Sequence, residues 1–285
     1  MKYKLKYGRE RMVKAKVGVS LYCYHIDLMK GKMTVKDCID HAADLGVFGI
    51  EIVDKQHIPN YPYPSLYDLL ELRDYVESYG MVISCYSTYI DVMIRTNEWL
   101  GLEGQIKMLL NDIVEANILG AKVLRATPPT KFGAHTAEGE RFESYKEYIE
   151  DVVDVSKRVL PYLKKYDVRL GLEIHEPRPP EVNLSIVKQV NDEYVGLVPD
   201  FSVWDTATGK QPLEKLQDCL PYTVHVHAKA HKFDEKGEEP TIPFNKLIPV
   251  IRDSNFSRFI SAEFEGWGDS RENTKKLVEL IRRYL

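Results

Sequence analysis

An alternation of two kinds of segment, repeated eight times, constrains the fold of this chain more than any other feature of its sequence. Short apolar runs rich in β-branched residues are each followed by a longer amphipathic stretch, the pattern of a parallel strand and its crossover helix. Eight such units without a domain-sized linker favour closure into a (β/α)8 TIM barrel, an α/β fold that a single domain of 285 residues can form. The predicted strands are residues 17–23, 48–53, 81–86, 121–126, 168–175, 195–200, 223–229 and 259–263.

Capping residues and glycines mark the predicted helix ends. Thr34 and Asp37 form a T-x-x-D pattern that predicts a helix start. A glycine follows each of three predicted helices, at Gly46, Gly80 and Gly120, where glycine commonly ends a helix. An open, doubly wound sheet is the competing architecture, but no G-x-G-x-x-G motif follows the first predicted strand. The pattern therefore favours the barrel.

Charge and composition narrow the function classes. Lys and Arg total 39 against 43 Asp and Glu, whereas nonspecific nucleic-acid binding needs clustered positive charge. The sequence has no apolar run long enough to span a membrane, and its basic start lacks the apolar region of a secretory signal. The four cysteines lie far apart, which fits a reducing compartment. We expect a cytoplasmic protein without nucleic-acid or membrane partners, with a basic N-terminal extension at 1–16 and the barrel at 17–285.

Polar residues gather where predicted strands five to eight end, at Glu173, Asp200, His227 and Glu263. The carboxyl ends of barrel strands form the face that carries active sites, and inward side chains converge there. Carboxylates crowded together repel one another unless a cation lies between them. Mostly oxygen ligands with one imidazole nitrogen suit Mn²⁺, Mg²⁺ or Co²⁺. Each residue alone could be an ordinary rim or salt-bridge residue, but all four at matching depth predict a site for one divalent metal ion.

Other residues near strand ends are candidates for binding the substrate. His225 could instead face the core, Arg125 could form a structural salt bridge, and Trp204 could pack at an edge. Residues 127–139 are long enough to form a lid. The substrate-binding candidates are Glu51, His57, Tyr86, Arg125, His225, Lys229 and Trp204.

The strand-end motifs resemble those of the xylose isomerase-like TIM barrel superfamily of sugar isomerases and epimerases. Glu173 lies in GLEIHE, Asp200 in GLVPDFS, His227 in HVHAK and Glu263 in ISAEFEG. The resemblance implies a sugar substrate and these four residues as ligands of a divalent metal, with Mn²⁺ first. It further implies Glu173 and Glu263 as an acid/base pair that moves a proton through an enediolate. Relatives often form homo-oligomers.

His175, two residues after Glu173, departs from the minimal pattern of the superfamily and becomes a third catalytic candidate. It resembles an E-I-H variant, and some related barrels are lyases on 3-oxo-glycosides, including subunits of C-glycoside deglycosidases. In such an enzyme a histidine beside the metal would be the base for β-elimination, and a small partner subunit would be expected. The DNA-repair branch of the superfamily resembles this chain less, because it has a metal-binding histidine where this chain has Val203. A sugar-binding barrel without catalysis is the remaining alternative.

Overall fold

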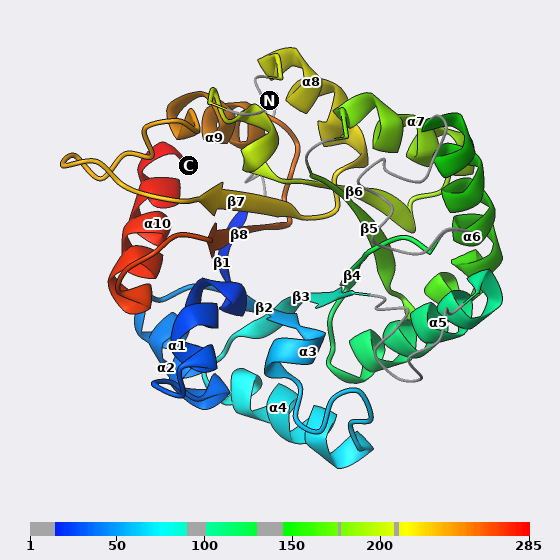
Figure 1. Ribbon diagram of the computed structural model, residues 1–285, viewed down its shortest axis with the longest axis horizontal. Coiled ribbons are helices and arrows are strands. Elements are labelled where there is room, and N and C mark those ends of the chain that lie inside the picture. The colour runs from blue at the N-terminus through cyan, green and yellow to red at the C-terminus, as the bar shows by residue number, and fades with distance from the viewer. Residues whose placement is uncertain (1–14, 90–100, 130–144, 176–177, 208–210) are drawn as a thin grey trace, which may run out of the picture.

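The computed structural model describes residues 15–89, 101–129, 145–175, 178–207 and 211–285. Eight parallel strands form one sheet in the order β6-β5-β4-β3-β2-β1-β8-β7, and helices surround it as an outer ring (Figure 1). The predicted TIM barrel is confirmed. The strands are β1 (Lys16–Ser20), β2 (Gly49–Val53), β3 (Val82–Thr88), β4 (Val123–Ala126), β5 (Arg169–Ile174), β6 (Val195–Pro199), β7 (Val226–Ala230) and β8 (Phe259–Phe264).

The barrel closes between β6 and β7, and these two strands are paired at fewer positions than any other neighbouring pair. Two isolated bridges join the two sides, Leu197 with Thr223 and Asp200 with His227. By contrast, β7 and β8 pair over five consecutive positions, as do β5 and β6. We call the β6/β7 contact the closing seam.

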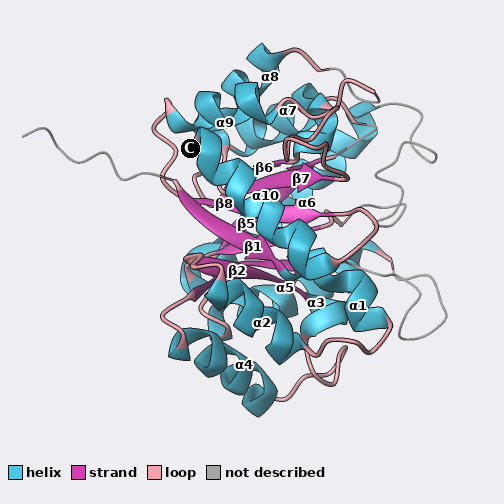
Figure 2. Cartoon of the chain, turned by 90° about the vertical axis from the view of Figure 1, so that its left-hand side faces the viewer, coloured by secondary structure: helices cyan, strands magenta, loops and turns pink. Residues whose placement is uncertain are grey.

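The helices cover the outside of the sheet, as the side view shows (Figure 2). None of the helices in the described ranges is long and apolar enough to cross a membrane. They are α1 (His25–Met29), α2 (Val35–Asp44), α3 (Asp54–His57), α4 (Leu66–Ser78), α5 (Leu102–Ile118), α6 (Tyr145–Tyr166), α7 (Pro180–Val190), α8 (Leu213–Cys219), α9 (Phe244–Arg252) and α10 (Ser270–Tyr284), with 3-10 helices η1 (Leu21–Tyr24), η3 (Phe201–Trp204) and η4 (Leu220–Tyr222).

The predicted helix ends are confirmed, whereas the first and seventh strands each have a boundary three residues from the predicted one, and smaller shifts occur in other strands. Thr34 and Asp37 form a capping box at the start of α2, and Gly46, Gly80 and Gly120 all have positive φ. The first strand ends at Ser20, three residues early, because the Ser20 side chain accepts a hydrogen bond from the Tyr22 amide (3.4 Å) and begins η1. The seventh strand begins at Val226 rather than at residue 223.

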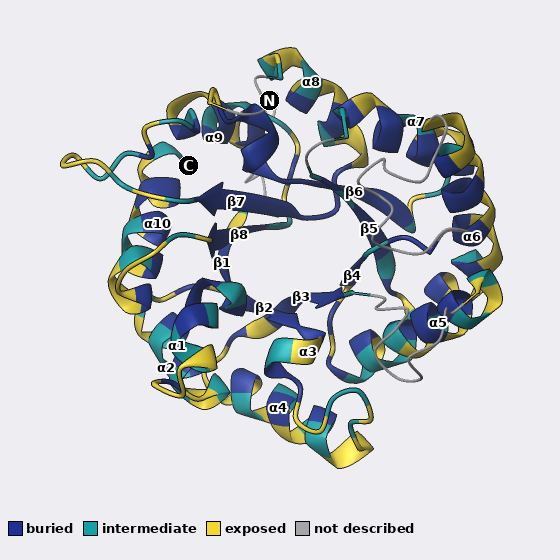
Figure 3. Cartoon of the chain, viewed as in Figure 1, coloured by how far each residue is buried: buried dark blue, intermediate teal, exposed yellow. Residues whose placement is uncertain are grey.

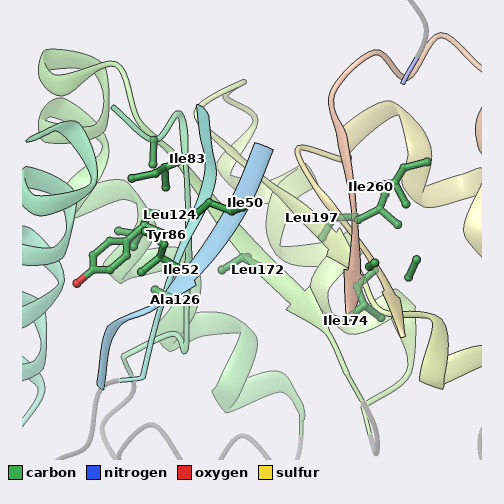
Figure 4. Close-up of a cluster of buried hydrophobic side chains, with 14 of the residues drawn as sticks. Ile50, Ile52, Ile83, Tyr86, Leu124, Ala126, Leu172, Ile174, Leu197 and Ile260 are labelled. Atoms are coloured by element: carbon green, nitrogen blue, oxygen red, sulfur yellow. The ribbon is translucent and has the colours of Figure 1, made fainter. Parts of the chain in front are cut away.

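The main apolar core lies between the strands and the helices, where buried faces meet (Figure 3). Figure 4 shows members of this core, including Ile50 and Ile52 of β2. Because strand side chains alternate, Glu51 between them points to the inside of the barrel. A second, small apolar cluster of Cys85, Val123, Val198 and Val224 is separate from the main core.

Gly171 makes room for that small cluster, since a Cβ there would lie 2.6 Å from Val198 Cγ2 and 3.4 Å from Val123 Cγ1. We interpret the cluster as packing inside the barrel, beneath the polar strand ends. All four cysteines of the chain are buried and unpaired, which agrees with the absence of a disulfide framework.

Candidate metal centre

The structure brings the four predicted metal ligands together. One donor atom from each of Glu173, Asp200, His227 and Glu263 lies within 4.8 Å of the others. His227 Nδ1 is 2.7 Å from Glu173 Oε1 and 3.2 Å from Glu263 Oε2. We refer to these four residues as the ligand cluster. Glu173 and Glu263 lie near the carboxyl ends of β5 and β8, Asp200 follows β6 directly, and His227 is the second residue of β7. The four residues therefore lie on both sides of the closing seam.

Two buried cations hold the carboxylates of the cluster. Lys229 Nζ lies 2.9 Å from Asp200 Oδ2 and 3.8 Å from Glu263 Oε2, and it also pairs with Glu265 Oε2 at 2.9 Å. The Arg125 guanidinium forms an ion pair with Glu173. Carboxylates nevertheless outnumber these two cations, which leaves the site suited to a further positive charge.

Burial and neighbouring charges shift the pKa values of the catalytic candidates Glu173 and Glu263 in opposite directions. Burial alone would raise the pKa of Glu173, but the Arg125 charge and the His227 hydrogen bond hold that pKa well below its usual range. For Glu263, burial outweighs the charges of Lys229 and His227 and raises the pKa to about 7. In the metal-free protein Glu173 is therefore ionised at neutral pH, whereas Glu263 can carry a proton.

His227, the histidine of the ligand cluster, is protonated in the metal-free protein. Burial would lower the pKa of His227, but the neighbouring carboxylates Glu51, Glu263 and Glu173 raise it well above its usual range. A proton on this imidazole thus takes the place that a metal cation would fill.

The residues present fit a divalent metal ion. Three carboxylates and one imidazole form a mostly oxygen donor set. Asp200 Oδ2 and Glu263 Oε2 are buried, yet within the described part of the chain neither receives a well-directed hydrogen bond. Buried carboxylate oxygens normally have such partners, and here both oxygens have only ion-pair contacts with Lys229 and, at Glu263, with His227 among the described residues, which leaves lone pairs for a metal ion.

Two substrate-binding candidates join a second cluster deeper in the barrel. His225 Nε2 lies 3.1 Å from Glu51 Oε2 and 2.8 Å from Ser261 Oγ. His227 Nε2 lies 3.1 Å from the same oxygen of Glu51. All four side chains are at most 1% exposed, so Glu51 and His225 lie behind His227 and not at an open surface.

Arg125 and Lys229, by contrast, reach the ligand cluster directly. Arg125 forms an ion pair with Glu173. Its guanidinium also lies over the Tyr89 ring, with Cζ 4.5 Å from the ring centroid. Its buried Nε and Nη1 atoms have no hydrogen-bond partner within the ranges that the structure describes.

Three other candidates are not brought to the cluster. The Tyr86 hydroxyl donates to Glu115 of α5 at 2.7 Å, on the outer side of the sheet (Figure 4). His57 Nδ1 accepts from the Val53 amide at 2.8 Å, and burial lowers its pKa to about 3, which makes it a neutral structural acceptor. The buried Trp204 indole donates to the Pro212 carbonyl at 3.1 Å, so it packs in the core.

His175 is half-buried at the end of β5, and it is near enough to Glu173 and Asp200 to act on both electrostatically. The proposed lid falls mostly on residues 130–144, outside the described residues.

Sequence reasoning missed Ser87, Ser261 and Glu265 as members of the site. Ser87 donates to Glu51 Oε1 at 2.7 Å, and Glu265 pairs with Lys229. A signal was present for Ser261, which lies two residues before Glu263 on the same face of β8, whereas Glu265 follows the end of that strand.

Comparisons with known proteins agree with this architecture. A family model described as xylose isomerase-like TIM barrel matches residues 39–284. The 3'-dehydrocarminate deglycosidase alpha subunit of a Microbacterium species is 21% identical and covers 88% of this chain and 88% of its own. The C-glycoside deglycosidase alpha subunit of Arthrobacter globiformis is 22% identical, over 94% of this chain and 89% of its own.

Solved structures show the same fold. D-psicose 3-epimerase from Clostridium cellulolyticum H10, with D-tagatose, has a TM-score of 0.71 and 14% identity over 94% of this chain and 96% of that chain. The IOLI protein with a bound zinc atom has a TM-score of 0.72 and 18% identity over 95% and 99%. At such identities the likeness establishes the fold alone.

Proposed function

Because this chain belongs to the xylose isomerase-like TIM barrel family, we propose that it is a divalent-metal-dependent enzyme that removes the proton α to a carbonyl group in a sugar or sugar derivative. One observation carries the proposal: Glu173, Asp200, His227 and Glu263, which come from β5, β8 and β7 and from the residue that follows β6, bring their donor atoms within 4.8 Å of one another. These four residues would hold the ion. Mn²⁺ is the ion we propose first, then Mg²⁺ and Co²⁺, and the zinc-bound structural neighbour adds Zn²⁺ to the panel.

The bound ion would supply Lewis-acid stabilisation of the negative charge that develops on the carbonyl oxygen. Side chains of the protein transfer the protons and stabilise the remaining charge. Glu173, ionised and fixed by Arg125, accepts the α proton. Glu263, the other carboxylate of the proposed acid/base pair, then delivers a proton to carbon. Delivery to the opposite face of the same carbon completes an epimerisation. Delivery to the former carbonyl carbon, with the proton of the adjacent hydroxyl passing to the former carbonyl oxygen, completes an isomerisation. Lys229 and Arg125 add positive charge beside the substrate oxygens.

Proton NMR in D₂O tests this proposal with the Mg²⁺ form of the enzyme and a panel of ketoses, inososes and 3-oxo-glucosides. We expect deuterium at the carbon next to the carbonyl, with loss of this exchange in Glu173→Gln and an unchanged circular dichroism spectrum. Full exchange by Glu173→Gln, or by wild-type enzyme stripped of metal, would overturn the proposal.

A second candidate function, β-elimination from a 3-oxo-glycoside, is favoured by two observations. The two full-length curated relatives are named as deglycosidase alpha subunits. His175 lies near enough to Glu173 and Asp200 to act on both electrostatically, which places an imidazole base beside the ligand cluster. In this reaction the C2 proton passes to the base and a C1–C2 double bond forms. The C1–aglycone bond breaks, and the aglycone keeps the electron pair and takes up a proton.

The two functions differ in products and in the effect of His175→Ala. Elimination predicts aglycone release from 3-oxo-glucosides, lost in His175→Ala and kept in the control His41→Gln, because His41 lies on α2 and contacts Tyr24. An epimerase returns the proton without releasing an aglycone and tolerates His175→Ala better. Aglycone release at the wild-type rate by His175→Ala would rule out its role as the base.

We also propose that the chain works in an assembly, either a homo-oligomer or a complex with a small second subunit. The names of the two curated relatives, both alpha subunits, support the second form. Light scattering after size-exclusion chromatography of the purified chain tests the first. A strictly monomeric and fully active chain would contradict both.

A further inference from the structure

Glu51 is a buried carboxylate that the proposed chemistry does not use. It projects from β2 into the barrel and is 1% exposed. Its Oε1 atom accepts a hydrogen bond from Ser87 Oγ at 2.7 Å. Its Oε2 atom lies 3.1 Å from Nε2 of His225 and 3.1 Å from Nε2 of His227. A carboxylate this deeply buried needs a compensating partner, and here two imidazoles and a hydroxyl provide it.

The two nitrogens of His227 face different groups. Nδ1 faces Glu173 and Glu263 of the ligand cluster, whereas Nε2 faces Glu51. Glu51 is thus separated from the ligand cluster by the imidazole ring itself. This placement argues against contact with the substrate, which was the expectation from the sequence.

We infer that Glu51 is a positioning residue that fixes the tautomer and orientation of His227, so that Nδ1 is presented to the metal ion. This inference rests on the metal site of the proposed function. The contact between Glu51 Oε2 and His227 Nε2 is an ion pair rather than a straight hydrogen bond, so the charge of Glu51 carries the effect. A carboxylate on the outer nitrogen of a ligating imidazole makes the inner nitrogen a stronger donor to a metal.

The surroundings hold Glu51 in this place. Ser87 anchors one of its oxygens from β3, and His225, itself 2.8 Å from Ser261 Oγ, contacts the other. These contacts fix the orientation of the Glu51 carboxylate toward His227 Nε2.

Glu51, His225 and His227 could alternatively bind a second metal ion of their own. His227 would then have to give a nitrogen to each of two ions and lose both of its protons. His225 Nε2 and Glu51 Oε1 already have partners in Ser261 and Ser87. The geometry favours the positioning role, and metal stoichiometry separates the two possibilities.

The test is calorimetric titration of metal-stripped protein with Mn²⁺, without substrate, comparing wild type with Glu51→Gln. The amide is isosteric but uncharged. We expect one ion per chain in both proteins and a dissociation constant roughly 10–100-fold higher in Glu51→Gln. Ser84→Ala is the matched control, since Ser84 is a buried residue of β3 whose hydroxyl donates to the Ile50 carbonyl and contacts neither histidine. It should bind Mn²⁺ as wild type does.

Ser87→Ala is a second variant, because it leaves the charge of Glu51 in place and removes only its anchor. It should weaken Mn²⁺ binding by less than about tenfold. Unchanged affinity in Glu51→Gln would overturn the inference, whatever the affinity of Ser87→Ala. So would two ions per wild-type chain with one lost in Glu51→Gln. Absence of Mn²⁺ binding by wild type would defeat the proposed function as well, whereas wild-type binding unaffected by Glu51→Gln defeats the positioning role alone.

Discussion

Metal binding should depend steeply on pH, because the ion must displace protons from the ligand cluster. His227 carries a proton in the metal-free protein across the neutral range, since its pKa lies well above its usual value. Glu263, with a pKa of about 7, carries roughly 0.9 of a proton at pH 6 and roughly 0.1 at pH 8. Binding should therefore release about two protons at pH 6 and about one at pH 8.

The magnitude follows from this count. Each released proton lowers the affinity about tenfold for each unit that the pH falls. Between pH 8 and pH 6, His227 contributes about a hundredfold and Glu263 about tenfold, so the affinity should fall about a thousandfold. The sign is fixed, because protons compete with the metal and lower pH must weaken binding.

Calorimetry with Mn²⁺ at pH 6, 7 and 8 measures both quantities. Repeating each titration in two buffers of different ionisation enthalpy gives the number of protons released. Fewer than one proton released at pH 6, or an affinity that changes less than about tenfold between pH 6 and 8, would refute the assignment of His227 and Glu263 as protonated ligands.

Three further predictions concern stability and reactivity. Lys229→Met should cost about 3–5 kcal/mol in urea unfolding with EDTA present, because it leaves Asp200 buried and unpaired, and a loss below about 1 kcal/mol would contradict this. Gly196→Ala should cost about 1–3 kcal/mol, because its Cβ would lie 2.4 Å from Val224 Cγ1. Gly101→Ala, with nothing within 4 Å, is the control, and equal losses in the two variants would argue against the steric cause. The four buried cysteines should react with a thiol reagent only in denaturant, since burial raises their pKa values, to about 12 at Cys23; rapid reaction of native protein would contradict the burial.

The ligand cluster could be predicted from sequence because it depends on local rules. Parallel strands in a barrel end at one face, and alternation decides which residues point inward. Glu173 and Glu263 follow from those two rules. The same alternation excludes Tyr86, since Cys85 and Ser87 face inward on either side of it. Tyr86 lies near a strand end, but its side chain faces the helices and contacts Glu115 instead of the ligand cluster.

Other contacts depend on geometry that strand order leaves open. Whether Arg125 reaches Glu173, or Lys229 reaches Asp200, is set by the stagger between neighbouring strands and by side-chain rotamers. His57 turns back onto the Val53 amide because the four-residue helix α3 follows β2 at once. No periodicity in the sequence encodes that turn.

Because the ligand cluster lies across the closing seam, its side chains help to hold the barrel closed. Glu173 and Asp200 stand on the β5–β6 side of the seam, and His227 and Glu263 stand on the β7–β8 side. Few backbone hydrogen bonds join the two sides, so side-chain attraction between Asp200 and Lys229, and between Glu173 and His227, supplements them. A cation bound by all four ligands would connect the β5–β6 side of the barrel to the β7–β8 side. Its removal would loosen the β6/β7 junction first, and amide hydrogens of β7 would then exchange with solvent ahead of those of β2.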